Sequence, residues 1–145
     1  MSDPDLTLTV TGEPLVAELE AIGAGLTAFN EAEFGPAHRT PLAVVVRNDE
    51  DAIVAGISGY TAWDWLYVQW LWVDDAFRGQ QLAAKMLDAA EAEARARGCR
   101  NSWIDTFSPV AFKVYERHGY VAFGALDDFP PGHTRTFLKK SLAAT

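Results

Sequence analysis

The stretch LWVDDAFRGQQLAAKML, residues Leu71–Leu87, decides the fold of this chain. It predicts an apolar strand that ends in a short polar turn and continues as an amphipathic helix. The first backbone N–H groups of a helix lack partners inside it, and the helix dipole is positive at that end. A strand that leads straight into a helix therefore makes an anion site, and we expect a phosphorylated ligand to bind there.

The composition is that of one compact domain covering residues 1–145. Hydrophobic residues make up 49% of the 145 positions and no segment is of low complexity, so the chain can bury a core. The net charge of −8 argues against a nucleic-acid partner, because phosphate backbones are bound by clustered Lys and Arg. Residues 1–40 carry seven acids and one base, Arg39. These acids either form a solvated face that aids solubility or attract an amine substrate.

Cysteine usage and the N-terminal residues indicate the compartment. Cys99 is the only cysteine, so it forms neither an intrachain disulfide nor a zinc site by itself. It follows Gly98 and precedes an apolar run, which predicts a small buried side chain. Asp3 and Asp5 stand where a signal peptide carries positive charge, and no apolar run is long enough for a membrane span. We expect a cytoplasmic protein with no membrane partner.

The rest of the chain alternates between strand and helix patterns. Gly-Glu-Pro at residues 12–14 opens a helix with one apolar face that needs a sheet to cover it, formed by Leu15, Leu19, Ile22, Leu26 and Phe29. Apolar runs predict strands at Leu6–Thr11, Leu42–Arg47, Ile53–Thr61, Leu66–Val73, Asn101–Thr106, Tyr120–Leu126 and His133–Leu142.

Two more helices follow the most apolar strand, Leu66–Val73, which has aromatic residues on both faces. Gln80–Arg97 has an apolar stripe, and the expected order of strand, helix and strand predicts a crossover between parallel strands. Ser108 caps a short third helix that begins at Pro109. The stripe of the second helix is Leu82, Met86, Ala90 and Ala94, and its expected surface ion pairs are Glu91–Arg95 and Glu93–Arg97.

Three motifs in this order resemble the GNAT superfamily of acyl-CoA-dependent N-acetyltransferases: Leu71–Val73, Arg78–Ala83 and Val114–Tyr120. The resemblance covers essentially the whole chain. It implies an α/β (α+β) fold with a mixed, mostly antiparallel twisted sheet of about seven strands, helices on both faces and a central β-α-β crossover. It also implies transfer of an acetyl group from acetyl-CoA to a primary amine in a ternary complex, without a metal.

The resemblance implies which residues bind coenzyme A. In the family, Arg/Gln-x-x-Gly-x-Gly/Ala presents backbone amides to the pyrophosphate; Arg78 fits its first place and Ala83 its last, but Gln81 stands where glycine is usual. The pyrophosphate can still dock if Gln81 keeps helical backbone angles and points its side chain outward. Ser108 either lies near the cofactor arm or, more simply, caps its helix. The implied cofactor residues are Leu71, Trp72, Val73, Arg78, Gly79, Gln80, Gln81, Leu82, Ala83 and Ser108.

Tyr115 matches the tyrosine that in many members points at the sulfur of coenzyme A. A positioned phenol can protonate the thiolate that leaves the tetrahedral intermediate. The alternative is one more aromatic packed on an apolar helix face. A general base is harder to assign, because Gln69 and Trp70 stand where relatives carry Glu. Asp105 is the nearest acid by family geometry, and a water chain to solvent would remove the need for a base.

Family members build the acceptor site from segments that correspond here to Phe29–His38, Tyr60–Tyr67 and Asp127–Arg135. Trp63, Trp65 and Tyr67 alternate and are expected to share one face, for core packing or for cation–π contact with an amine. The candidate substrate residues are Phe29, Trp63, Trp65, Tyr67, Asp105 and His133. The resemblance implies a small-molecule or peptide amine as the acceptor and, by family analogy, a homodimer. A non-catalytic acyl-CoA-binding or interaction module is the alternative, suggested by Gln81 and the missing carboxylate base.

Overall fold

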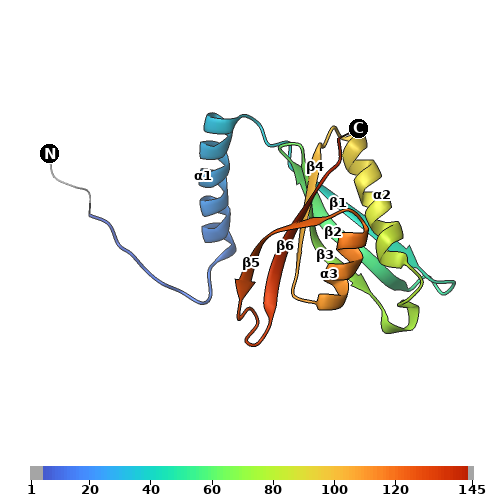
Figure 1. The fold of residues 1–145 in the computed structure, drawn as a ribbon. Coiled ribbons are helices and arrows are strands. Elements are labelled where there is room, and N and C mark those ends of the chain that lie inside the picture. Colours follow the sequence, from blue (N-terminus) through green and yellow to red (C-terminus); the bar gives the residue numbers. More distant parts are fainter. Residues whose placement is uncertain (1–4, 144–145) are drawn as a thin grey trace. The chain divides into compact units, whose positions relative to one another are not determined.

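A computed structural model describes residues 5–143 and divides the chain into two compact units, residues 1–37 and 38–145. The first unit contains helix α1 (Val16–Phe34), and the second contains every strand and the other helices (Figure 1). Over the described range, no helix is long and apolar enough to cross a membrane.

The first unit confirms the predicted helix but not the predicted strand before it. The N–H of Leu15 donates to the Glu18 carboxylate at 2.8 Å, and Val16 begins the helix. Residues 5–11 form no strand, so the expectation for Leu6–Thr11 is wrong. Alternation of apolar and polar residues produces a strand only where a neighbouring strand supplies hydrogen bonds.

The second unit is built on one six-stranded sheet in the order β1-β2-β3-β4-β6-β5, instead of about seven strands, since Leu6–Thr11 forms none. Only β3 and β4 are parallel, and α2 (Leu82–Ala96) connects them as the predicted crossover. The strands are β1 (Thr40–Arg47), β2 (Ile53–Ala62), β3 (Trp65–Val73), β4 (Asn101–Thr106), β5 (Val121–Asp127) and β6 (Thr134–Ser141).

Helices α2 and α3 (Pro109–Arg117) contribute to a single hydrophobic core with the sheet. The Ser108 hydroxyl accepts the N–H of Ala111 at 3.2 Å, which confirms the predicted cap of α3. Cys99 is buried in the core, as expected for a small hydrophobe, and burial raises the pKa of its thiol. The buried residues of α2 are Met86, Leu87, Ala90, Glu91 and Ala94. Coverage of the second face of the sheet by a helix stays a prediction.

One residue in that stripe corrects the sequence analysis. Glu91 was expected on the helix surface beside Arg95, but its side chain is 1% exposed. Leu87 and Ala94 lie four residues before and three after it, so Glu91 falls in the middle of the buried stripe. The Arg95 pair exists at 3.9 Å, yet it reaches a buried carboxylate.

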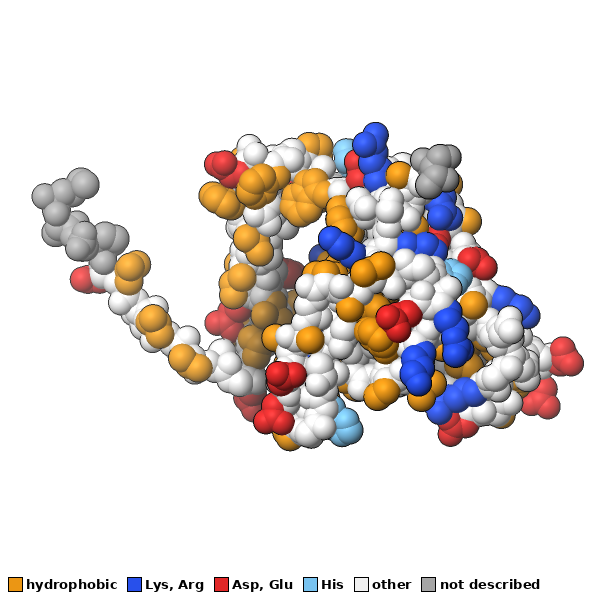
Figure 2. All heavy atoms as spheres, viewed as in Figure 1, with side chains coloured by type: hydrophobic (Ala, Val, Ile, Leu, Met, Phe, Trp, Pro, Cys, Tyr) orange, Lys and Arg blue, Asp and Glu red, His pale blue; other side chains and the backbone are white. Residues whose placement is uncertain are grey.

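Charge is divided unevenly between the units. The first unit carries seven acidic residues and no Lys or Arg, whereas the second carries thirteen acids and twelve bases and is nearly neutral. Figure 2 shows the Lys and Arg side chains that are visible from this side gathered on the second unit. The acidic character predicted for residues 1–40 is therefore a property of the whole first unit.

Candidate active site

The central feature of the site is a split between the two parallel strands. β3 pairs with β4 only over Trp65–Val68, opposite Asn101–Ile104, although β3 continues to Val73 and β4 to Thr106. On its other side β3 stays paired with β2 as far as Val73. On this side, the backbone groups of β3 beyond Val68 are therefore not paired with β4.

A β-bulge marks the start of this split. Ser58 lies opposite Trp70 and Gly59 opposite Val68, so Gln69 is the extra residue of β3. A bulge bends its strand and reverses which side chains face the core. Before it, Leu66 and Val68 are buried; after it, Leu71 and Val73 pack on the core, and Trp70 and Trp72 are exposed.

The bulge requires a glycine on the neighbouring strand. A Cβ added to Gly59 would lie 1.9 Å from the carbonyl oxygen of Tyr67. No side chain fits at that distance, so the close approach of β2 and β3 is possible only with glycine.

The turn after β3 leads into the N-terminus of α2, as predicted. Asp75–Phe77 form a 3₁₀ turn, and Arg78 pairs with Asp75 at 2.7 Å and donates from Nε to the carbonyl of Val73 at 3.2 Å. The first turn of α2 contains no acidic residue, so no carboxylate of that turn compensates the positive end of the helix dipole. This geometry suits an anion.

Gln81 does not have the helical backbone angles under which the pyrophosphate was expected to dock. It is the N-cap of α2, with φ 60° and ψ 26°, and therefore has a left-handed and not a right-handed helical backbone. Gly79, two residues earlier, also has a positive φ of 82°. Glycine adopts such angles freely, which explains physically why glycine is usual at the place of Gln81. Its N–H group is retained.

Tyr115 is the buried tyrosine of α3, with 4% of its surface exposed. Its carbonyl accepts the N–H groups of His118 at 3.1 Å and Tyr120 at 3.0 Å, which close the C-terminal turn of the helix. Burial, with a smaller contribution from the Asp105 carboxylate, raises the pKa of Tyr115 to about 12. The phenol therefore keeps its proton at neutral pH.

Asp105 and Tyr67 meet on the opposite face of the sheet from the core. Arg135 donates to Asp105 Oδ1 from Nε at 2.9 Å and from a terminal nitrogen at 2.7 Å, and the Tyr67 hydroxyl lies 3.4 Å from Oδ2. Tyr67 stacks on Trp103 with ring centroids 3.9 Å apart. Burial, followed by the charge of Asp105, raises the pKa of Tyr67. This arrangement is an aromatic surface beside a carboxylate that one arginine already holds.

The other predicted acceptor residues are not all brought to this cluster. Trp63 lies with Asp64 in the turn between β2 and β3, where both have positive φ, so it does not continue the alternation of Trp65 and Tyr67 along the strand. Trp65 is half-buried at the start of β3. Phe29 belongs to α1 in the first unit. Its place in the acceptor site stays a prediction.

His133 and Ser108 line a separate cavity of about 420 Å³ next to the N-terminus of α3. His133 lies in the turn before β6 and does not begin the strand; its N–H donates to the carbonyl of Pro130 at 2.8 Å. The cavity includes neither Tyr115 nor Arg78–Ala83. Its other lining residues are Thr106, Phe107, Pro109, Phe112, Lys113, Gly132, Thr134 and Thr136.

Sequence reasoning missed two partners of the predicted residues. Arg135, which binds Asp105, is the last residue of the segment expected to line the acceptor site, and Trp103 lies in a predicted strand with no role expected for its side chain. The alternation of Trp103 and Asp105 on one strand was a signal, because it places both on the same face. Nothing local in the sequence pairs either residue with β6 or β3.

Comparison with known proteins identifies the family of this chain. Residues 15–120 match the model of the Acetyltransferase (GNAT) family. Acetyltransferase Atu2258 of Agrobacterium fabrum is 45% identical over 125 residues, which cover 86% of this chain and 91% of that protein. Blasticidin-S acetyltransferase of Streptomyces morookaense is 38% identical over 91 residues, which cover 62% of this chain and 67% of that protein.

A solved structure agrees with these relatives. The crystal structure of an acetyltransferase from Bacillus cereus has a TM-score of 0.81 to this chain at 28% sequence identity, and the match covers 92% of this chain and 97% of the other. The incomplete pairing of β3 with β4, the N-terminus of α2 and the family match support the same assignment. This chain belongs to the GNAT family and is an N-acetyltransferase.

Proposed function

We propose that the protein transfers the acetyl group of acetyl-CoA to an amine of a small molecule, by direct attack within a ternary complex, with Tyr115 as the acid. The observation that carries this proposal is the split between β3 and β4, in a domain that also holds a buried, protonated tyrosine in α3. The N-terminus of α2 at the end of the same strand supplies free N–H groups for a pyrophosphate.

The proposed reaction has two bond changes at the thioester carbon. The amine nitrogen attacks this carbon and a C–N bond forms; the C–S bond then breaks, and the leaving sulfur takes the phenolic proton of Tyr115. The proton lost by the nitrogen passes to water, and the tyrosinate is reprotonated from solvent. A backbone N–H at the exposed edge of β3 stabilises the negative carbonyl oxygen between the two steps.

The high pKa of Tyr115 is compatible with this role. Moving a proton from a phenol of pKa about 12 to a thiolate of pKa about 8.5 is uphill by roughly 5 kcal/mol. A turnover of about 10 per second corresponds to a barrier of roughly 16 kcal/mol, so the transfer fits within it. A phenol that stays protonated at neutral pH can donate a proton there, which supports the role of acid over that of base.

The proposed coenzyme A contacts follow the chain from the strand edge into the helix. Leu71, Trp72 and Val73 present backbone groups to the pantetheine arm, and Arg78–Ala83 surround the pyrophosphate. The Arg78 guanidinium is already paired with Asp75, so backbone N–H groups carry most of the phosphate contact. Ser108 uses its hydroxyl as a helix cap, which favours the simpler of its two predicted roles.

The acceptor that we propose is a compact amine carrying a flat or cyclic group. Tyr67 and Trp103 offer a stacked aromatic surface, and Asp105 beside them provides a carboxylate directly after Ile104, the last β4 residue paired with β3. The similarity to Blasticidin-S acetyltransferase favours a small molecule over a peptide and makes blasticidin S the first compound to test.

The first experiment separates the enzyme from a non-catalytic binding module. Acetyl-CoA is titrated into the purified protein by calorimetry, and release of free thiol is then measured with blasticidin S and a panel of small amines and peptides. Binding followed by thiol release with an amine supports the proposal. Binding without turnover across the panel favours the module, and absence of binding contradicts both.

The second experiment tests Tyr115. Tyr115→Phe removes one hydroxyl and should lower kcat by about 10²-fold, while the dissociation constant for acetyl-CoA and the thermal midpoint stay close to those of the parent protein. In the parent protein, kcat should rise as the acceptor amine deprotonates and then remain level to about pH 10, because the phenol does not ionise below that. An unchanged kcat in the variant would show that Tyr115 is not the acid.

The proposal also covers the oligomeric state and the cellular compartment of the protein. The chain is 12% aromatic, which leaves room for an apolar interface between two copies. We propose a homodimer in the cytoplasm, without a nucleic-acid or membrane partner. Sedimentation of the purified protein would reveal a monomer if the dimer is wrong.

A further inference from the structure

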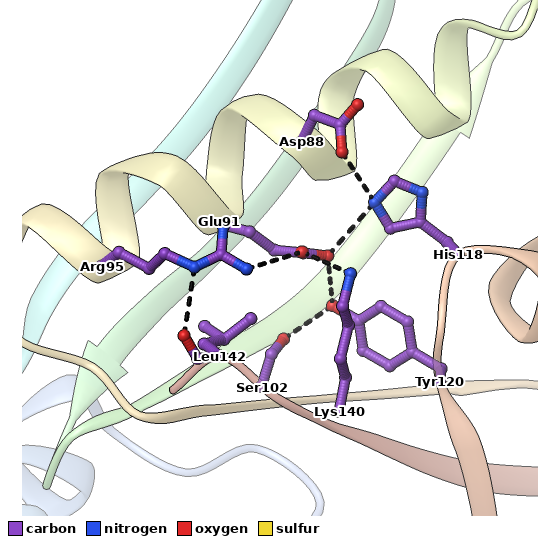
Figure 3. Close-up of polar contacts among 8 residues, drawn as sticks. All are labelled: Asp88, Glu91, Arg95, Ser102, His118, Tyr120, Lys140 and Leu142. Atoms are coloured by element: carbon purple, nitrogen blue, oxygen red, sulfur yellow. Dashed lines mark hydrogen bonds and ion pairs between the residues drawn. The ribbon is translucent and has the colours of Figure 1, made fainter. Parts of the chain in front are cut away.

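The buried carboxylate of Glu91 lies where α2, β6 and the turn after α3 meet (Figure 3). Its Oε1 accepts from Lys140 Nζ at 2.7 Å, and its Oε2 accepts from the Tyr120 hydroxyl at 3.1 Å. A buried carboxylate is costly unless its charge is paired and both oxygens are hydrogen-bonded, and here both conditions hold. None of these groups has a part in the reaction proposed above.

The Tyr120 hydroxyl fixes the direction of the hydrogen bonds. It has one proton, which goes to Glu91, so the Ser102 hydroxyl 2.8 Å away must donate to the Tyr120 oxygen. Burial, opposed by the Ser102 hydrogen bond and reinforced by Glu91, raises the pKa of Tyr120. The hydrogen bonds from Ser102 of β4 through Tyr120, just before β5, to Glu91 of α2 therefore all run in one direction and end on a charge.

His118 adds a contact from the same turn. Its Nε2 lies 3.1 Å from Asp88 and 3.4 Å from Glu91, and the side chain is 13% exposed. Gly119 follows with φ 96°, and a Cβ there would lie 3.3 Å from Cε of Lys140. His118 and Tyr120 of this turn thus lie next to the Glu91 carboxylate, and Gly119 leaves room for the Lys140 side chain.

This turn is also what ends α3 and fixes Tyr115. The N–H groups of His118 and Tyr120 both donate to the Tyr115 carbonyl. The Tyr115 and Tyr120 rings are 6.4 Å apart. A side chain of α2 therefore holds the turn whose backbone holds Tyr115, and the N-terminus of the same α2 forms the proposed pyrophosphate site.

We infer that Glu91 is a positioning residue for acyl transfer: through Tyr120 and Lys140 it sets the place of Tyr115 relative to the N-terminus of α2. The inference rests on the proposed function of Tyr115 as the acid. A phenol displaced by a fraction of an ångström donates poorly to the sulfur, so the loss should fall on kcat and leave binding of acetyl-CoA nearly intact.

The test is a double-mutant cycle between Glu91→Gln and Tyr115→Phe. Gln has the shape of Glu but a single acceptor oxygen, so either Lys140 or Tyr120 must face an amide N–H group. Rates are measured with acetyl-CoA and the panel amine of highest turnover; where no amine reacts, hydrolysis of acetyl-CoA by water is measured. Glu93→Gln is the matched control, because Glu93 lies on the same helix, 48% exposed and paired only at 3.7 Å with Arg97.

The expected result is a fall in kcat of about 10-fold for Glu91→Gln, an unchanged KM for acetyl-CoA, and no further fall when the change is made in the Tyr115→Phe background. Glu93→Gln should match the parent protein. Equal effects of Glu91→Gln in both backgrounds, or a lower thermal midpoint with unchanged kcat, would overturn the inference and leave the role of Tyr115 standing.

Two further measurements keep the outcomes distinct. If Glu91→Gln does not fold, Tyr120→Phe replaces it in the cycle, since it removes only the hydroxyl that joins Ser102 to Glu91. If Tyr115→Phe alone leaves kcat unchanged, the proposed function of Tyr115 fails, and that single variant shows it before the cycle is considered.

Discussion

Replacing Gln81 by glycine should stabilise the protein, although it removes a side chain. Gln81 has φ 60° at the N-cap of α2 and makes no side-chain cap hydrogen bond, so its side chain contributes nothing there to offset the backbone conformation. A left-handed backbone costs a residue with a Cβ about 1–2 kcal/mol. Glycine avoids that cost but loses about 0.5–1 kcal/mol more chain entropy on folding.

The midpoints of these two ranges leave a gain of about 0.75 kcal/mol in the free energy of unfolding. An unfolding entropy of about 2 cal/mol/K per residue gives roughly 0.3 kcal/mol/K for a chain of 145 residues. The thermal midpoint of Gln81→Gly should therefore rise by about 2–3 °C. Because the backbone N–H is kept and the mouth of the turn is opened, acetyl-CoA should bind at least as tightly as it does to the parent protein.

Gln80→Gly is the matched control. Gln80 is exposed, adjacent, of the same residue type, and absent from the positions with positive φ, so glycine there gives only the entropic loss. Its thermal midpoint should fall by up to about 3 °C. Calorimetric melting of the three proteins and titration with acetyl-CoA provide the measurement. A Gln81→Gly protein that melts no higher than the parent, while Gln80→Gly also shows no fall, would refute the reasoning.

Two further predictions concern the sheet and the buried phenols. Gly59→Ala should lower the free energy of unfolding by more than about 3 kcal/mol, because its Cβ would meet the Tyr67 carbonyl oxygen, whereas Gly124→Ala, with nothing within 4 Å, should change it by less than about 1 kcal/mol; urea midpoints of both variants decide this. The pKa values of Tyr115 and Tyr120 are raised above the unfolded value of about 10, so their contribution to stability is complete below pH 10 and is lost as the pH rises from there toward 12; a urea midpoint that stays level across that window would contradict it.

The elements with local signals could be predicted from the sequence. Ser108 followed by Pro109 marks a helix start by its own chemistry, and the cap is present in the structure. The β3-α2-β4 crossover follows from an apolar strand, an amphipathic helix and a second strand, and these too are local patterns. The prediction of a strand at Leu6–Thr11 was wrong for the opposite reason. A strand forms only with a partner strand, and no local pattern supplies one.

The bulge at Gln69 shows why the centre of the site was harder to predict. The run Leu66–Val73 looked like a strand covered on both faces, because apolar side chains occupy odd and even positions. In the structure the core-facing set changes from Leu66 and Val68 to Leu71 and Val73 across the bulge. A strand whose core-facing residues switch from even to odd positions at one polar residue has almost the same sequence as a uniformly buried strand. Only the pairing with Gly59 distinguishes the two.

The burial of Glu91 was also hard to predict, in this case because the residue is charged. An acid four residues before an arginine on a helix predicts a solvated pair; the Glu91–Arg95 pair forms, but its carboxylate is buried. The burial of the carboxylate depends on Lys140 and Tyr120, which lie far away in the sequence and reach it only when β6 and β5 join the sheet. Position within the stripe indicated burial, and charge indicated exposure; the distant partners decide between them. Residues for which two local rules disagree are therefore the places where tertiary structure, and the reaction that depends on it, have to be examined.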